Sequence, residues 1–211
     1  PGLAIAPDSP VDKVARDRLS TVYMPGWKIT MLPDDVVQRY TLTEGRDCPA
    51  LSLYVTLDET TLEVKGHESR IERVPIAANL RHDLLDEAVT EASLTGQAPA
   101  THPFATELAF CFRLAQALKA RREVVRGRPE TFTRPDYSFK LQPPAERPPQ
   151  GDDTPPDGSE TVLISVRRRG APLDLIVSEA MILANSTWGG WLAERGVPGI
   201  YRSQASLAPG I

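Results

Sequence analysis

The sequence predicts an α+β fold in which the strands pair antiparallel. Three observations support this class. Alternating apolar and polar residues indicate two pairs of strands, one within residues 49–76 and one within residues 137–169. Apolar residues at helical spacing indicate two helices between these pairs and one after them. The third observation is the resulting order, strand, strand, helix, helix, strand, strand, helix, which is typical of an α+β domain.

A short helix is predicted near the N-terminus, over residues 10–19, where four apolar residues share one face: Val11, Val14, Ala15 and Leu19. Ser9 can cap this helix, and Pro10 suits its first position. The next stretch, residues 22–33, is interrupted by Pro25, Gly26 and Pro33, which predicts a loop.

A second short helix is predicted over residues 32–40, and its adjacent Asp34 and Asp35 allow two interpretations. Paired carboxylates can indicate a metal site. Carboxylates in a first helical turn also complement the helix dipole and the unpaired backbone N–H groups. The second interpretation is favoured.

The first strand pair is predicted over residues 49–58 and 60–76, with Gly66 marking a bend or bulge. Residues 81–94 predict an amphipathic helix, with an apolar face formed by Leu84, Leu85, Ala88, Val89 and Ala92. Residues 103–127 predict a long helix with arginines at its C-terminal end and an apolar seam of Phe104, Leu108, Cys111, Ala115 and Leu118.

The second strand pair is predicted over residues 137–142 and 160–169. The residues between these strands, at about 142–159, are rich in proline, glycine and aspartate. This composition predicts a flexible insertion rather than a part of the core.

The last predicted helix, "VSEAMILANSTWGGWLAERG", covers residues 177–196 and has a predicted core face of Val177, Met181, Ala184, Trp188 and Trp191. Gly189 and Gly190 weaken a helix by on the order of 1 kcal/mol each, which makes sense where a backbone or a ligand approaches closely. Glu179 and Asn185 either bond to neighbouring backbone groups or face a polar cavity, and periodicity does not choose between these alternatives.

The composition, 41% hydrophobic and 25% charged, is that of a globular protein. No apolar run approaches the roughly 18 residues of a membrane span. The first residues lack the methionine, basic flank and long apolar core of a signal peptide. We therefore expect a piece of a longer cytoplasmic protein, with Cys48 and Cys111 as reduced thiols and no structural zinc site.

The charge distribution is uneven, although the net charge is −4. Basic residues outnumber acidic ones between Arg113 and Arg134, and residues 167–169 form a second basic cluster. Such clusters can line a channel for a polyanion. They can equally be two solvated surface faces, and this second interpretation is favoured from the residues alone.

Several segments together carry a family resemblance. The stretch "IVSEAMILANSTWGGWLAERGVPGIYR", residues 176–202, resembles the signature helix and exit of the RNB domain, the catalytic domain of the ribonuclease II family of exoribonucleases. Residues 1–36 resemble the family's stretch from a helix to a proline-containing loop, and "FTRPDYSF" resembles the strand after its long helix. Because the order and spacing agree along nearly the whole chain, residues 1–211 are identified as a partial RNB domain.

The resemblance implies a fold and an activity. The fold is an RNB-type α+β domain, with a mixed, mainly antiparallel sheet and helices packed around an RNA channel. The activity is that of a 3′-to-5′ processive exoribonuclease, which acts on single-stranded RNA and releases nucleoside 5′-monophosphates with Mg²⁺. Aromatic side chains would hold the terminal bases, because stacking tolerates any sequence.

The resemblance also assigns roles to individual residues. Tyr23 and Phe132 would stack on bases, and His82 lies where an aromatic residue often contacts RNA. Arg202 would contact a phosphate, and Glu179 would be the acidic residue at the catalytic site. Without the resemblance, each would be interpreted as an ordinary core or surface residue.

The chain also departs from the family pattern. Relatives usually have two glutamates where this chain has Ser178 and Glu179, so Glu179 either takes over the catalytic role or is structural. The family's aspartate cluster and its late arginine segment are absent. Hydrolysis of a phosphodiester by this route needs metal ions held by converging carboxylates. We therefore expect the Mg²⁺ ligands to lie elsewhere in the intact enzyme, and the isolated chain to be inactive.

One alternative function is a non-catalytic RNA-binding or protein-interaction module on a degenerate RNB scaffold, which Ser178 mildly supports. A small-molecule enzyme is disfavoured, because the sequence has no P-loop, nucleophile elbow or "GxGxxG" motif. The expected partner is single-stranded RNA, and neither DNA nor a membrane is expected.

Overall fold

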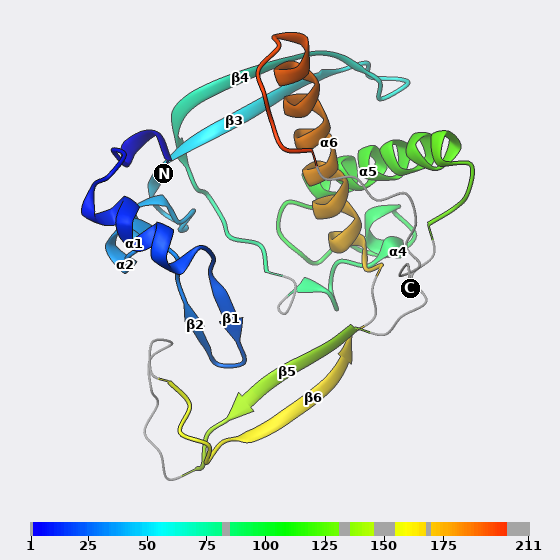
Figure 1. Ribbon diagram of the computed structural model, residues 1–211. Helices are drawn as coiled ribbons and strands as arrows, with labels where there is room; N and C mark the ends of the chain where they lie inside the picture. Colours follow the sequence, from blue (N-terminus) through cyan, green and yellow to red (C-terminus); the bar gives the residue numbers. More distant parts are fainter. Residues whose placement is uncertain (1, 82–84, 131–135, 146–154, 168–169, 202–211) are drawn as a thin grey trace. The chain divides into compact units, whose positions relative to one another are not determined.

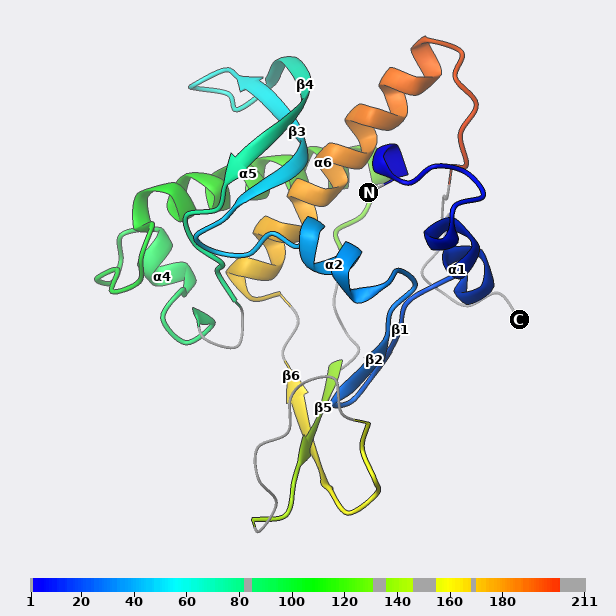
Figure 2. The ribbon, with the colours of Figure 1, turned by 90° about the vertical axis from the view of Figure 1, so that its left-hand side faces the viewer.

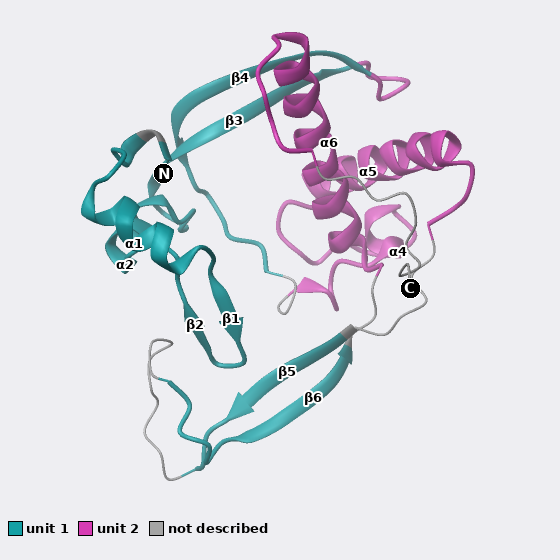
Figure 3. Cartoon of the chain, viewed as in Figure 1, with its two compact units in different colours: residues 1–57, 64–81, 132–169 teal, residues 58–63, 82–131, 170–211 magenta. Residues whose placement is uncertain are grey.

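The computed structural model describes residues 2–81, 85–130, 136–145, 155–167 and 170–201 (Figure 1). Helices and antiparallel strands occur along the chain, which confirms the predicted α+β class. The described strands form three separate two-stranded antiparallel ladders. The chain divides into two compact units (Figure 3): unit 1 contains residues 1–57, 64–81 and 132–169, and unit 2 contains residues 58–63, 82–131 and 170–211.

Unit 1 contains all the described strands and three short helical segments (Figures 1 and 2). Its elements in order are η1 (Gly2–Ala4), α1 (Pro10–Arg18), β1 (Val22–Met24), β2 (Trp27–Ile29), α2 (Asp34–Tyr40), β3 (Asp47–Leu57), β4 (Val64–Pro75), β5 (Asp136–Gln142) and β6 (Thr161–Arg167).

The first two helices begin where the sequence predicts. At α1, the Ser9 hydroxyl accepts a hydrogen bond from the backbone N–H of Asp12 at 3.3 Å, and Pro10 is the first helical residue. At α2, Asp34 and Asp35 both lie in the first turn, where a carboxylate complements the helix dipole.

The loop predicted for residues 22–33 is wrong in part, because β1 and β2 form a hairpin there. Tyr23 pairs with Lys28 in this hairpin. Pro25 and Gly26 make the connection, and Gly26 adopts a φ of +71°, which glycine tolerates. Two of the three interrupting residues, Pro25 and Gly26, therefore form the turn of a hairpin, and the third, Pro33, precedes α2.

The two longer ladders match the predicted strand pairs. In β3–β4 the register runs from Asp47 opposite Pro75 to Leu57 opposite Val64, and it shifts next to Gly66, as the bulge prediction requires. In β5–β6, Tyr137, Phe139 and Leu141 face Val166, Ile164 and Val162. The proline-rich stretch connects these two strands, and its residues 146–154 lie outside the described residues.

Unit 2 consists of α4 (Glu91–Leu94), α5 (Ala105–Arg126) and α6 (Pro172–Glu194), together with the tip of the β3–β4 hairpin. Its hydrophobic core joins all three helices and contains Val89, Leu94, Leu108, Phe112 and Leu173. No helix in the described ranges is long and apolar enough to cross a bilayer.

The helix predicted over residues 81–94 is interrupted. Thr90 has an extended backbone and caps α4, where it exchanges hydrogen bonds with Ser93 in a capping box. A new helix therefore begins after Thr90, and the capping chemistry overrides the apolar periodicity. His82 and Leu84 lie outside the described residues.

The residues that are buried in the two long helices also differ from the predicted core residues. In α5, Phe112 is buried, whereas Phe104 has a φ of +57° and lies before the first helical residue. In α6, the predicted core residue Met181 is 59% exposed, whereas Glu179 is buried. A buried carboxylate needs a partner, and Glu179 has one in Arg122 of α5.

The two adjacent glycines of α6 have different surroundings. Tyr201 donates a hydrogen bond from its hydroxyl to the carbonyl of Gly189 at 3.1 Å, so the chain after α6 folds back over this glycine. A Cβ at Gly189 would lie 3.5 Å from the Tyr201 ring, and a Cβ at Gly190 would have no described atom within 4 Å. The group that approaches Gly189 is therefore a side chain at ordinary van der Waals distance, and neither glycine has the close backbone neighbour that was expected among the described residues.

Replacing Gly190 with alanine is expected to stabilise unit 2 by about 1 kcal/mol, because alanine restricts the unfolded chain and the position is open. Hydrogen exchange of α6 amides in the intact protein measures this change. Gly127→Ala is the matched control, and it should destabilise by about 1 kcal/mol because Gly127 has a φ of +72° at the end of α5. A loss of protection in Gly190→Ala would show that another segment packs there.

Candidate functional site around Glu179

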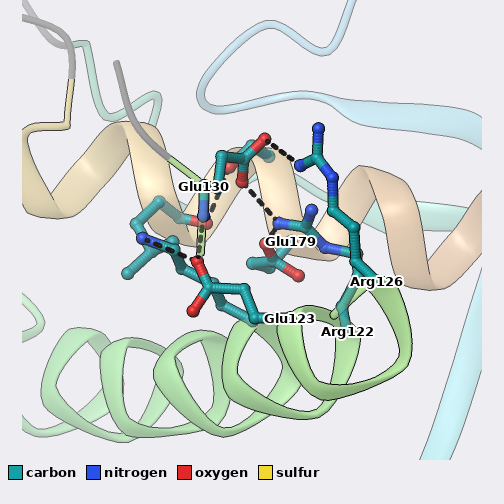
Figure 4. Close-up of polar contacts among 8 residues, drawn as sticks. Arg122, Glu123, Arg126, Glu130 and Glu179 are labelled. Atoms are coloured by element: carbon teal, nitrogen blue, oxygen red, sulfur yellow. Dashed lines mark hydrogen bonds and ion pairs between the residues drawn. The ribbon is translucent and has the colours of Figure 1, made fainter. Parts of the chain in front are cut away.

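The candidate site lies between α5 and α6 in unit 2 (Figure 4). Glu179, in the second turn of α6, is only 2% exposed. Arg122, in the last two turns of α5, points toward it. The two helices pack against each other through their apolar residues, and this packing places the two charged side chains together.

Arg122 bridges two carboxylates. Its Nη2 atom donates to Glu179 Oε1 at 2.5 Å and to Glu130 Oε2 at 2.7 Å. The hydrogen bond to Glu179, followed by the one to Glu130, raises the pKa of the Arg122 guanidinium above its already high value. The arginine therefore stays charged at every physiological pH, and it neutralises a carboxylate that would be costly to bury alone.

Further polar contacts involve the end of α5, and two of them attach Glu130, beyond the helix, to residues of α5. The backbone N–H of Glu130 donates to Glu123 Oε1 at 2.7 Å. Arg126 Nη1 lies 3.7 Å from Glu130 Oε1, and Lys119 Nζ lies 3.8 Å from Glu123 Oε1. Each acidic side chain here therefore has a basic neighbour, and these contacts hold the backbone between the end of α5 and Glu130 against the helix.

Much of the basic cluster predicted between Arg113 and Arg134 is used inside unit 2. Besides Arg122, Arg126 and Lys119, Arg121 donates to the carbonyls of Thr61 and Leu62 at the tip of the β3–β4 hairpin. The contacts favour a structural role for this part of the cluster over an RNA-lining role. Arg134 and residues 168–169 lie outside the described residues.

The polar residues on either side of Glu179 have local explanations. The Ser178 hydroxyl donates to the Leu175 carbonyl at 3.1 Å, and the Ser186 hydroxyl donates to the Leu183 carbonyl at 3.0 Å. Asn185 is exposed. Glu179 thus bonds to a side chain of another helix, Arg122, rather than to neighbouring backbone groups or a polar cavity. Periodicity within one helix cannot reveal such a partner.

The described residues do not fit a magnesium site. Within them, no three histidine, cysteine, aspartate or glutamate side chains are grouped so that they could hold a metal ion. One carboxylate oxygen of Glu179 is bound by Arg122, and the side chain is shielded from solvent. This environment suits an electrostatic anchor between two helices better than a base or a metal ligand.

The other predicted site residues lie elsewhere. Tyr23 belongs to unit 1, on β1, and its side chain is 79% exposed. Phe132, His82 and Arg202 lie outside the described residues. Sequence reasoning missed the roles of Arg122 and Glu130. The only available signal was an arginine-rich helix end followed by a glutamate, which is also typical of an ordinary helix terminus.

Comparison with known proteins shows the class of this chain. The family model of the RNB domain matches residues 2–209, so the chain belongs to the RNB domain family, and the predicted family is confirmed. It is 31% identical over 212 residues to Exoribonuclease 2 of Vibrio parahaemolyticus, a match that covers 99% of this chain and 29% of that protein. It is 32% identical over 219 residues to Exoribonuclease 2 of Edwardsiella piscicida, with coverage of 100% and 30%.

The chain therefore spans only about 29–30% of the length of these curated relatives. Among solved structures, it is similar to an active-site mutant of the Dss1 exoribonuclease from Candida glabrata. The TM-score is 0.66 and the sequence identity is 22%, and the match covers 92% of this chain and 24% of that one. At this identity the likeness shows the fold alone.

Proposed function

We propose that this chain is part of a 3′-to-5′ exoribonuclease that degrades single-stranded RNA processively and releases nucleoside 5′-monophosphates. The observation that carries the proposal is the RNB match over residues 2–209, together with relatives that bear the name Exoribonuclease 2. In this proposal the chain supplies walls of the RNA channel and base-stacking residues, in a cytoplasmic enzyme.

Tyr23 is the proposed stacking residue whose surroundings are described. Its side chain is exposed on a short hairpin, and its cross-strand partner is the exposed Lys28. An accessible ring beside a cation suits a single-stranded nucleic acid, which combines stacking bases with a charged backbone. Phe132 and His82 as base contacts, and Arg202 as a phosphate contact, are proposed from the family resemblance.

Glu179 is proposed to act as a positioning residue. Its ion pair with Arg122 supports this role, because it holds α5, α6 and Glu130 in one arrangement. Magnesium, as the proposed metal, would supply Lewis acidity at the scissile phosphate. Its ligands would be carboxylates outside the residues described, and the isolated chain is expected to release no mononucleotides.

The test is an assay of the full-length protein with a uniformly labelled single-stranded oligoribonucleotide and Mg²⁺, so that every released nucleotide carries the label. Nucleoside 5′-monophosphates should appear without a ladder of intermediates. Tyr23→Ala should weaken RNA binding about tenfold, because one stacked base contributes roughly 1–3 kcal/mol. Val22→Ala is the matched control, since adjacent strand residues point to opposite faces, and it should bind like the parent protein.

Each of three results would contradict a part of the proposal. Binding of RNA without cleavage by the full-length protein would support the non-catalytic RNA-binding module instead. Equal RNA affinity of the Tyr23→Ala and Val22→Ala variants would show that Tyr23 does not stack on a base. Release of mononucleotides by the isolated chain would instead refute the placement of the metal ligands outside it.

A further inference from the structure

The β1–β2 hairpin of unit 1 has two different faces, because successive strand residues point to opposite sides. Among its paired residues, one face carries Tyr23 and Lys28, which lie directly opposite each other. The other face is apolar and consists of Val22, Met24, Trp27 and Ile29. Tyr23 is 79% exposed, whereas no residue of the apolar face exceeds 50%. The face with Tyr23 and Lys28 is therefore the more open of the two.

Lys28 places a positive charge beside the Tyr23 ring. The Cβ atoms of residues directly opposite each other on antiparallel strands lie about 4.5–5.5 Å apart, on the same face of the ladder. Lys28 is exposed, and it makes no ion pair or hydrogen bond with another residue that the structure describes. Its ammonium group is therefore available to an anion that comes to the ring.

A second tyrosine beside a cation, also in unit 1, has a charge that is already occupied. On the β3–β4 hairpin, the Arg70 guanidinium lies 4.5 Å from the centroid of the Tyr54 ring. Its Nε and Nη2 atoms donate to the two carboxylate oxygens of Glu68 at 2.8 and 2.7 Å, and the Tyr54 hydroxyl donates to Glu72 at 2.7 Å. The two carboxylates neutralise this cation and would repel a phosphate. In the described part of the chain, the pair on β1–β2 has no such carboxylate partner.

We propose that Lys28 binds a phosphate of the nucleotide whose base stacks on Tyr23, so that the β1–β2 hairpin holds one nucleotide of single-stranded RNA at two points. The sugar joins the base to its phosphate, so a base on the ring brings a phosphate within reach of a flexible four-carbon lysine stem. Stacking is insensitive to the identity of the base, whereas an ammonium–phosphate contact releases counterions and depends on salt. The assignment of Lys28 rests on the proposed function in that Tyr23 contacts RNA.

The test measures the affinity of the full-length protein for a single-stranded oligoribonucleotide at several salt concentrations, with EDTA in place of Mg²⁺ so that the RNA stays intact. Lys28→Gln should reduce the steepness of log affinity against log salt by about 0.7, the contribution of one phosphate contact on a single strand. Tyr23→Ala should weaken binding about tenfold at every salt concentration and leave the slope unchanged. Lys28→Arg keeps the charge and should keep the slope.

Arg70→Gln is the matched control, because Arg70 is also exposed on a hairpin of unit 1 but its charge is bound by Glu68. This variant should bind RNA with the slope of the parent protein. An unchanged slope in Lys28→Gln, or equal reductions in Lys28→Gln and Arg70→Gln, would overturn the proposal. A reduced slope in Lys28→Arg would overturn it too, because the effect would then come from the hairpin's structure rather than from the charge.

Cleavage by the parent protein is assayed separately, with Mg²⁺ present. A parent that cleaves RNA, together with an unchanged slope in Lys28→Gln, would refute the phosphate contact and leave the proposed function standing. A parent that does not cleave RNA, but whose salt slope depends on Lys28 as expected, would do the reverse.

Discussion

Replacing Arg122 with methionine is expected to lower the free energy of unfolding of unit 2 by about 3 kcal/mol. The substitution leaves Glu179 buried without its cationic partner, and breaking a buried pair from one side costs roughly 3–5 kcal/mol. We expect the lower end of that range, because Arg122 itself is partly accessible. Hydrogen exchange of α5 and α6 amides in the intact protein measures the change, since both helices belong to the same unit.

Two controls separate the buried pair from general helix effects. Arg126→Met removes a cation that lies 3.7 Å from Glu130 at the more exposed end of the network, and it should cost less than about 1 kcal/mol. The double variant Arg122→Met with Glu179→Leu removes both charges of the pair and should recover most of the lost protection. A double variant as unstable as the single one would show that the ion pair is not the source of the effect.

The same variants distinguish a positioning role of Glu179 from a catalytic one. If Glu179 positions the helices, the double variant should be both more stable and more active in RNA cleavage than Arg122→Met alone. If Glu179 takes part in the chemistry, the double variant is stable and inactive, and Glu179→Gln loses activity without losing protection from exchange.

Truncation of Phe112 to alanine is expected to destabilise unit 2 by about 3–5 kcal/mol, because it opens a cavity in the core between α4, α5 and α6. Phe110, two residues away on α5, is an apt control because its ring is partly exposed with Arg113 above it. Phe110→Ala should cost less than about 1.5 kcal/mol. The measurement is again amide exchange, and equal effects of the two truncations would contradict the assignment of Phe112 to the core.

The sequence predicts the fold class and most elements, because these depend on local patterns. Alternation identifies both long hairpins, and Ser9 and Pro10 mark the start of α1. Predictions fail where a contact with another element decides the outcome. Residues 22–33 form a hairpin despite their interruptions, and α6 faces inward with Glu179 rather than Met181. Apolar periodicity could not anticipate that an arginine on α5 would stabilise a buried carboxylate.

The candidate site is predicted less completely than the fold. Glu179 is correctly singled out as unusual on an apolar helix, but its partner Arg122 lies 57 residues earlier in the chain. The helix end that contains Arg122 also fits two simpler explanations, a favourable dipole interaction and a solvated surface. Pairing between distant positions is a property of the packed helices, and a single sequence does not report it.

The hydrogen bond from the Tyr201 hydroxyl to the Gly189 carbonyl closes a loop at the end of α6, because Gly189 lies in the second turn from the C-terminal end of that helix. Residues 195–200 are therefore attached to the same helix at both ends, once through the peptide chain and once through the tyrosine hydroxyl. Tyr201→Phe keeps the ring but removes the hydroxyl, so it would leave this segment attached at one end only.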